Sequence, residues 1–262
     1  MFKAPLALAA AAALLAACQT SPQPTGRFLS NYQGFEERSS LRASVRERRD
    51  EALLRQVERI HIEPAVLAPG AAPDISEGDK ALVLGEVDRQ LCYALSGVYI
   101  LMPEPGVGVA RVRPAVTKVT PTNPVGSGVS AVANVLIPGP LGVRAPGTTG
   151  MLAAETELVI NGRQASGLIW ARQANVVGVD SPSTSRVGDA LQFAGEFAGA
   201  AARAFAPREA NRQRPDNAGA CAKYGPPANA AGLVTQFVTG VYVPGLEGVK
   251  PQERQPRTRS PR

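Results

Sequence analysis

The dipeptide Asn161–Gly162, set between two long alternating segments, constrains the fold more than any other feature of the chain. Both residue types tolerate the positive φ that a two-residue hairpin turn requires at its central positions. Residues 151–160 alternate apolar and polar side chains before the turn, and residues 163–177 follow it as an apolar return strand. These segments predict an antiparallel β-hairpin with one face packed on a core.

The remaining periodic segments surround this hairpin in the sequence. Alternation or short apolar runs predict strands over 59–67, 98–102 and 107–120, and helical spacing predicts helices over 77–96, 186–205 and, rich in charge, Ser44–Gln56. We therefore expect an α+β fold with two layers, in which two helices pack on one face of a mostly antiparallel sheet of about four to five strands.

Charged residues mark the outward faces of two predicted strands. Glu155 and Glu157 alternate with apolar residues before the turn, and Arg111 and Arg113 do the same in 107–120. If the two strands are neighbours, the arginines would pair with the glutamates across the sheet, on a solvent-exposed face.

The N-terminus has the features of a targeting segment. Lys3 precedes an apolar run, Ala4–Ala17, which is too short to span a bilayer as a stable helix. Leu15–Ala16–Ala17–Cys18 resembles the lipobox of bacterial lipoproteins, in which the cysteine thiol accepts a diacylglycerol. An ordinary secretory signal cleaved near Ala17 is the alternative, with Cys18 incidental.

These features divide the chain into four parts. We expect a lipoprotein signal peptide (1–17), a lipidated Cys18 with its tether (18–35), one α+β domain that includes the charged helix (36–206), and a Pro/Arg-rich, largely irregular tail (207–262). Gln19 stands where sorted lipoproteins that stay at the inner membrane have Asp, so the resemblance implies the outer membrane and a periplasm-facing domain.

The net charge of +6 is mostly a property of the two ends. Lys3 supplies one charge, and five basic residues against Glu253 make the stretch 250–262 net +4. A secreted, lipid-anchored chain is not expected to bind nucleic acid. Its tail would either touch anionic lipid headgroups or remain solvated.

The chain has three cysteines, and acylation of Cys18 would leave Cys92 and Cys221. In an oxidising compartment such a pair would form a disulfide. Cys92 also falls on the apolar face of a predicted helix, where a free buried thiol is common. The sequence leaves both states open. Two cysteines and one histidine suggest no metal site, and no nucleotide or cofactor motif is present.

One long stretch, 119–143, contains no charged residue and is rich in Pro, Gly and Val. An apolar loop of this length would serve as a contact surface for a protein partner or lipid, or it would fold back and be buried. Its candidate contact residues are Val132, Val135, Leu136, Ile137, Leu141 and Val143.

Catalytic patterns are sparse. The single histidine, His61, lies on a predicted strand, and no serine occupies a Gly-x-Ser-x-Gly elbow. Exposed carboxylates beside arginines would stay ionised, whereas an acid catalyst needs a raised pKa. We therefore expect a non-enzymatic protein without catalytic residues.

Several segments together resemble a known family. The lipobox, "RFLSNYQGF" at 27–35, "IHIEPAVL" at 60–67, Ala115–Thr117 and "AAETELVINGRQASGLIWA" at 153–171 are similar to the bacterial lipoproteins grouped as domain of unknown function 3313. The resemblance implies a secreted, lipid-anchored α+β domain without an established activity.

The leading hypothesis is an envelope lipoprotein that presents a protein-contact domain, in an oligomeric state that the sequence does not indicate. A peptidoglycan- or lipopolysaccharide-binding module using Arg111, Arg113 and the basic tail is the alternative. A hydrolase built on His61 is a further one.

Overall fold

The structure is a computed structural model of the whole chain. It describes residues 20, 22–38, 40, 42–123, 142–143, 147–175, 177–178, 180–183, 185–208, 217, 219–226, 241–246 and 248–252.

The predicted hairpin forms the centre of the sheet. Strand β8 (Met151–Ile160) pairs antiparallel with β9 (Arg163–Gln173), and Asn161 and Gly162 turn between them with φ of 51° and 75°. Strand β6 (Val109–Thr120) pairs antiparallel with the other side of β8. The hairpin prediction is confirmed, because the turn residues supply the positive φ that the connection needs.

The sheet is larger than predicted and mixed rather than mostly antiparallel. Eight strands run in the order β1-β2-β9-β8-β6-β3-β5, with β4 paired to β6 beside this path. The flanking strands are β1 (Glu36–Arg38), β2 (Ser44–Arg49), β3 (Arg59–Ile62), β4 (Val66–Leu67) and β5 (Ile100–Leu101).

The expectation of four to five mostly antiparallel strands was therefore wrong, although the class remains α+β. Strand β3 pairs parallel with both β5 and β6, and β4 pairs parallel with β6. The reason is the order strand, helix, strand along the chain. A helix that connects two neighbouring strands returns the chain to the same end of the sheet, so the strands run parallel.

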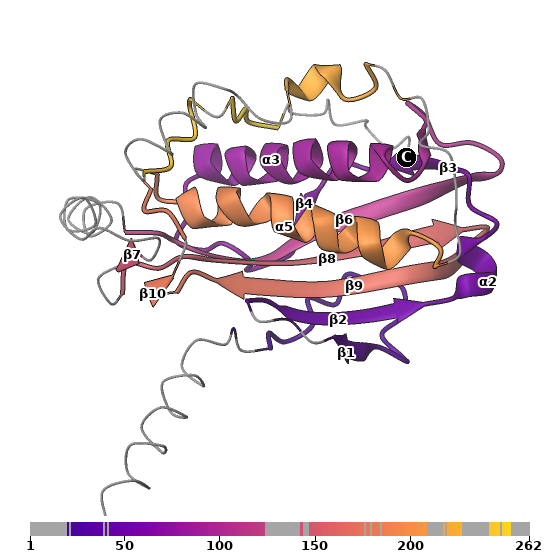
Figure 1. Cartoon of the computed structure of the whole chain (residues 1–262), viewed down its shortest axis with the longest axis horizontal. Helices are drawn as coiled ribbons and strands as arrows, with labels where there is room; N and C mark the ends of the chain where they lie inside the picture. Colours follow the sequence, from indigo (N-terminus) through magenta and orange to yellow (C-terminus); the bar gives the residue numbers. More distant parts are fainter. Residues whose placement is uncertain are drawn as a thin grey trace, which may run out of the picture.

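Helices α3 (Glu77–Ser96) and α5 (Gly188–Phe205) lie side by side on one face of the sheet, as Figure 1 shows. Ser76 caps α3 by accepting a hydrogen bond from the Asp79 main-chain N–H, as its position predicts. The core lies between helices and sheet, where Leu91, Leu158 and Phe197 are buried. Small residues along α5 allow the helix to approach the sheet closely.

The charged helix predicted over Ser44–Gln56 is another correction. Strand β2 occupies its first half, and only the four-residue helix α2 (Glu51–Leu54) follows, capped by Asp50. In β2, arginines alternate with Val45 and Glu47 and contact partners on both faces of the sheet. Because arginines lie on both faces, apolar and polar residues do not alternate along β2, and the sequence lacks the pattern that identifies a strand.

The remaining elements are short. Strands β7 (Gly142–Val143) and β10 (Val177–Gly178) form a separate two-stranded ladder, and η1 (Ala222–Tyr224) is a single 3-10 turn. Among the described residues, no helix is long and apolar enough to cross a membrane.

Candidate functional site

The face of the sheet opposite the helices carries the most unusual contacts in the molecule. Side chains alternate between the two faces of a strand, so Leu158 faces the helices while Glu155 and Glu157 face the other way. Residues 22–35, which we call the N-terminal strap, lie across this second face and cover both carboxylates.

Glu155 binds the strap mainly through main-chain groups. Its Oε1 accepts a hydrogen bond from the Gly26 N–H at 2.5 Å, and its Oε2 accepts from the Phe28 N–H at 3.4 Å. The Tyr32 hydroxyl donates to the same Oε2 at 2.5 Å. Gly26 is required by close approach, because a Cβ there would lie 2.2 Å from the Thr117 Cγ2.

Glu157 holds the next part of the strap and also an arginine. Its Oε2 accepts from the Ser30 main-chain N–H at 2.9 Å, the Ser30 hydroxyl at 2.6 Å and the Gln164 Nε2 at 2.7 Å. Its Oε1 accepts from the Arg113 Nη1 at 2.5 Å. The Arg113 guanidinium also lies 5.1 Å from the centre of the Phe28 ring. The predicted cross-strand pairing is therefore confirmed for Arg113, but it was wrong for Arg111, which pairs with Glu63 instead of either glutamate.

Both carboxylates are fully buried, with 0 % of their surface exposed, where the sequence predicted solvent exposure. The alternation along β8 correctly predicted that the two glutamates lie on the face of the sheet opposite the core. The cover comes from a segment more than 120 residues earlier in the chain, which the strand's own sequence does not reveal. Neither the strap nor the buried state of the pair was anticipated, and the only local signal was two acids alternating along one strand.

The geometry of the pair suits binding of the strap rather than proton transfer. The carboxylate oxygens accept hydrogen bonds from strap or sheet donors, which occupy the side of the pair that a substrate would approach. Burial, together with the hydrogen bond to Glu155, raises the pKa of Tyr32 to about 12, so this hydroxyl remains a donor at neutral pH.

The strap begins at the end of the sheet where β6 and β9 finish. The Gln173 N–H donates to the Thr20 hydroxyl at 3.2 Å, and that hydroxyl donates to the Arg42 carbonyl at 2.9 Å. Gln23 accepts from Arg46 through its carbonyl and from Lys118 through its side-chain oxygen. We call this end of the sheet the anchor end.

Cys18 itself lies outside the described residues, and so do five of the predicted contact residues: Val132, Val135, Leu136, Ile137 and Leu141. The main chain of Val143 is described, and it pairs with Val177 in the β7–β10 ladder. Of the six predicted contact residues, only Val143 falls within the described part of the chain.

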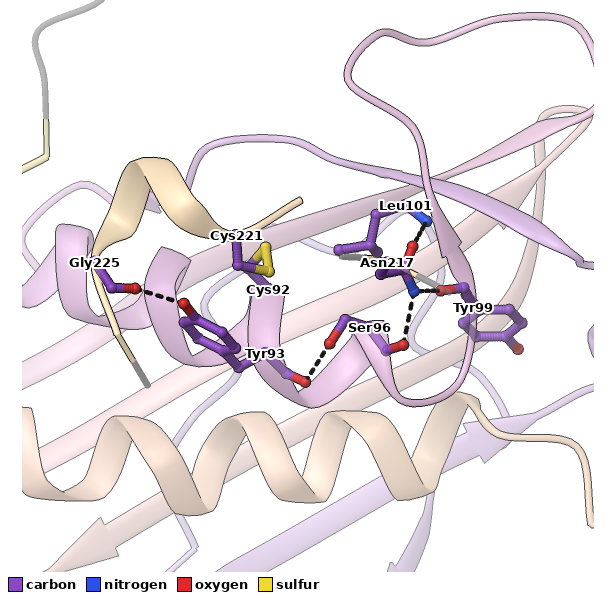
Figure 2. Close-up of a disulfide and its surroundings, with 8 residues drawn as sticks. All are labelled: Cys92, Tyr93, Ser96, Tyr99, Leu101, Asn217, Cys221 and Gly225. Atoms are coloured by element: carbon purple, nitrogen blue, oxygen red, sulfur yellow. Dashed lines mark hydrogen bonds between the residues drawn. A yellow bond between two sulfur atoms is a disulfide. The ribbon is translucent and has the colours of Figure 1, made fainter. Parts of the chain in front are cut away.

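Cys92 and Cys221 form a disulfide with a Cα–Cα distance of 5.8 Å. Figure 2 shows how it joins α3 to the segment around η1, beside two further sets of contacts. The Tyr93 hydroxyl donates to the Gly225 carbonyl, and the Asn217 amide donates to the Ser96 carbonyl at the end of α3 and to the Tyr99 carbonyl just after it. Asn217 thereby satisfies the Ser96 carbonyl, which the helix leaves without an intrahelical partner.

The C-terminal segment 248–252 packs against the same helix. A Cβ on Gly85 would lie 2.2 Å from the Lys250 carbonyl oxygen, so the glycine permits this contact. Asp88 accepts from the Ala65 N–H at 2.7 Å and from the Gln252 Nε2 at 2.8 Å. Burial raises the pKa of Asp88 to about 6, although these hydrogen bonds act in the opposite direction.

The residues proposed for the alternative functions have other partners. Arg111 pairs with Glu63 at 3.3 Å, and Arg113 with Glu157. The His61 Nδ1 lies 3.1 Å from the Met102 carbonyl oxygen. A cavity of about 530 Å³ beside His61 is lined by Glu104, Lys223 and Tyr224 among others, so it brings a carboxylate but, among the described residues, no serine to the same cavity as the histidine.

Comparison with known proteins gives one family and distant structural similarity. No curated protein matches the chain. Two solved structures of PelC dodecamers from Paraburkholderia phytofirmans are similar to it, each at 9 % identity. The match to the first structure covers 64 % of this chain and 99 % of the PelC chain, with a TM-score of 0.37. The match to the second covers 60 % of this chain and 96 % of the PelC chain, with a TM-score of 0.35.

A family profile described as a protein of unknown function matches residues 24–201, a range that contains the strap from Pro24 onward, both carboxylates and all but the last residues of α5. Since this match spans well over half of the chain, the protein belongs to the DUF3313 family of proteins of unknown function.

Proposed function

We propose that this protein is a non-enzymatic lipoprotein of the cell envelope, anchored through Cys18 to the outer membrane, that presents its α+β domain to a protein partner in the periplasm. The observation that carries the proposal is the lipobox ending at Cys18, followed within two residues by Thr20, which is hydrogen-bonded to the domain, and then by the strap.

This spacing has a direct mechanical consequence. Cys18 precedes Thr20 by two residues, and two residues span at most about 7 Å of extended chain. An acyl group on Cys18 would therefore hold the anchor end of the sheet close to the membrane, without a long free tether. Two or three acyl chains give stable anchoring, because each buried methylene adds about 0.8 kcal/mol.

The disulfide supports an extracytoplasmic location. Disulfides form and persist in oxidising compartments such as the bacterial periplasm, and Cys92–Cys221 joins two segments 129 residues apart. A single pair does not by itself distinguish the inner from the outer membrane, for which Gln19 is the supporting residue.

Replacement of the anchor cysteine tests the proposal. We expect Cys18→Ser to abolish incorporation of labelled fatty acid, to change electrophoretic mobility, and to move the protein out of the membrane fraction. The paired change Cys92→Ser/Cys221→Ser is the matched control and should leave the protein in that fraction. Unchanged fractionation and mobility of Cys18→Ser would refute the proposal.

The partner contact needs its own experiment. The uncharged stretch begins inside β6, where Val119 is buried, so its candidate contact residues are those further along the chain. Photocrosslinking probes at Val132, Ile137 and Val143 in cells should capture a periplasmic protein. A probe at Ala52, which is exposed on α2, is the control position. If a protein were captured by the probe at Ala52 but by none of the three other probes, the proposed partner contact would be refuted.

A further inference from the structure

Basic side chains gather around the beginning of the strap. Arg46 and Lys118 bind Gln23, Arg42 binds Thr20 through its carbonyl, and Arg27 belongs to the strap itself. Arg27, Arg42 and Lys118 are exposed and Arg46 is partly exposed. Within the described part of the chain, none of the four forms an ion pair with a carboxylate.

The backbone of β6 contributes to this cluster. The register between β6 and β8 shifts between Val116 and Lys118, which marks a β-bulge. Lys118 then pairs with Ala153, two positions along β8 from Glu155, so the bulge directs its side chain to the strap side of the sheet. The Lys118 Nζ reaches the Gln23 Oε1 at 3.1 Å.

We propose that the strap side of the anchor end is a membrane-contact surface, in which Arg27, Arg42, Arg46 and Lys118 bind the phosphates of anionic lipid headgroups. The proposal rests on the proposed function, since the acyl anchor on Cys18 places this surface near the bilayer. Two independent features support it: the two-residue distance from Cys18 to Thr20, and the unpaired positive charge around that point.

The anchor makes weak charge contacts effective. Once the chain is attached, docking of the domain is an intramolecular step with a high effective concentration. Each Lys or Arg near an anionic surface then changes the ratio of docked to undocked domain by about fivefold. Removing three charges should lower this ratio by about a hundredfold.

The test attaches the domain chemically, so that it does not depend on acylation in the cell. Cys18 is the one cysteine outside the disulfide, so in the chain from residue 18 onward it can be coupled to a maleimide lipid. Vesicles contain phosphatidylcholine alone or with phosphatidylglycerol, and a trace of dansyl-labelled lipid. The single tryptophan, Trp170, lies in β9 three residues before its end at Gln173 and is the energy donor.

We expect energy transfer from Trp170 to be higher on the anionic vesicles and to fall with added salt. Arg42→Gln/Arg46→Gln/Lys118→Gln should reduce it to the level seen on phosphatidylcholine, while glutamine keeps an N–H donor near Gln23. The matched control, Arg55→Gln/Arg59→Gln/Arg163→Gln, removes three exposed charges from the opposite end of the sheet and should leave transfer unchanged.

Equal transfer on the two kinds of vesicle, or an equal loss in both triple variants, would overturn the membrane-contact surface. A negative result here, together with loss of membrane fractionation by Cys18→Ser in cells, would refute this inference alone and leave the lipid anchor in place.

Discussion

Glu155 and Glu157 recognise the main chain of the strap more than its side chains. Three of their donors are the N–H groups of Gly26, Phe28 and Ser30, at every second residue. Ionised acceptors make stronger hydrogen bonds than neutral ones, so a buried carboxylate holds such a segment without a large apolar contact. Leu29 is the one strap side chain among the buried hydrophobic residues.

Glu155→Gln should therefore loosen the strap. The amide keeps one acceptor oxygen and places an N–H group against the Gly26, Phe28 or Tyr32 donors, which costs about 1–3 kcal/mol for a buried unsatisfied group. Trypsin should then cleave after the exposed Arg27 about 5- to 150-fold faster, because cleavage requires local opening. Glu77→Gln, an exposed carboxylate on α3, should leave the rate unchanged.

Tyr32 should make strap docking sensitive to alkaline pH. Its pKa is raised from 10.0 to about 12 in the folded protein, so its contribution is fully present below pH 10 and is lost as the pH rises to about 12. Burial also raises the pKa of Tyr224, so Tyr32 is identified by difference: ultraviolet titration of the wild type minus that of Tyr32→Phe should show one hydroxyl that titrates near pH 12. A titration that Tyr32→Phe leaves unchanged would contradict this assignment.

Asp88 should make stability depend on pH in the acidic range. Its pKa rises from 3.8 to about 6 on folding, so the folded state favours the protonated acid. That contribution is fully present below pH 3.8 and is lost as the pH rises through about 6. Urea unfolding between pH 4 and pH 7 should show a decline relative to Asp88→Asn. A constant difference between the two proteins would show that burial does not shift this group.

Among the elements, α3 depends most on a covalent bond to a distant segment. The loop closed by Cys92–Cys221 is long, and loss of such a disulfide typically costs about 2–5 kcal/mol. Cys92→Ser/Cys221→Ser should lower the free energy of unfolding measured in urea by that amount. It should also speed hydrogen exchange over 217–226. Reduced wild-type protein is the control and should match the variant. Unchanged exchange in both proteins would mean that the hydrogen bonds of Asn217 and Tyr93 hold the segment 217–226 on α3 without the disulfide.

Elements were predictable from sequence where one residue type determines the backbone. Asn161–Gly162 identified the β8–β9 turn, and Ser76 and Gly97 identified the two ends of α3. Strand β2 was mistaken for a helix because its arginines have partners on both faces, which removes the apolar alternation. Such a strand is identified by its neighbour, β9, rather than by its own residues.

At the scale of the whole molecule, the short distance from Cys18 to Thr20 should determine how far the domain extends from the membrane. Insertion of ten Gly/Ser residues between Gln19 and Thr20 adds up to about 35 Å of reach. Energy transfer from Trp170 to labelled lipid should fall accordingly in protein attached to phosphatidylcholine vesicles, where charge contacts do not hold the domain at the surface. The same insertion in the turn after Asn161, at the opposite end of the sheet, should not change it. Equal transfer with and without the first insertion would contradict a short tether.

The sequence by itself determined the α+β class, the central hairpin and the α3 boundaries, because turn residues, caps and strand period act over a few positions. Only the tertiary structure decided that the sheet has eight strands of mixed direction and that residues 22–35 bury two carboxylates. The physical reason is range. Which strands are neighbours, and which segment covers a face, depends on contacts between residues far apart in the chain: 50 positions for Arg59 and Val109 in the sheet, and 127 for Phe28 and Glu155 under the strap.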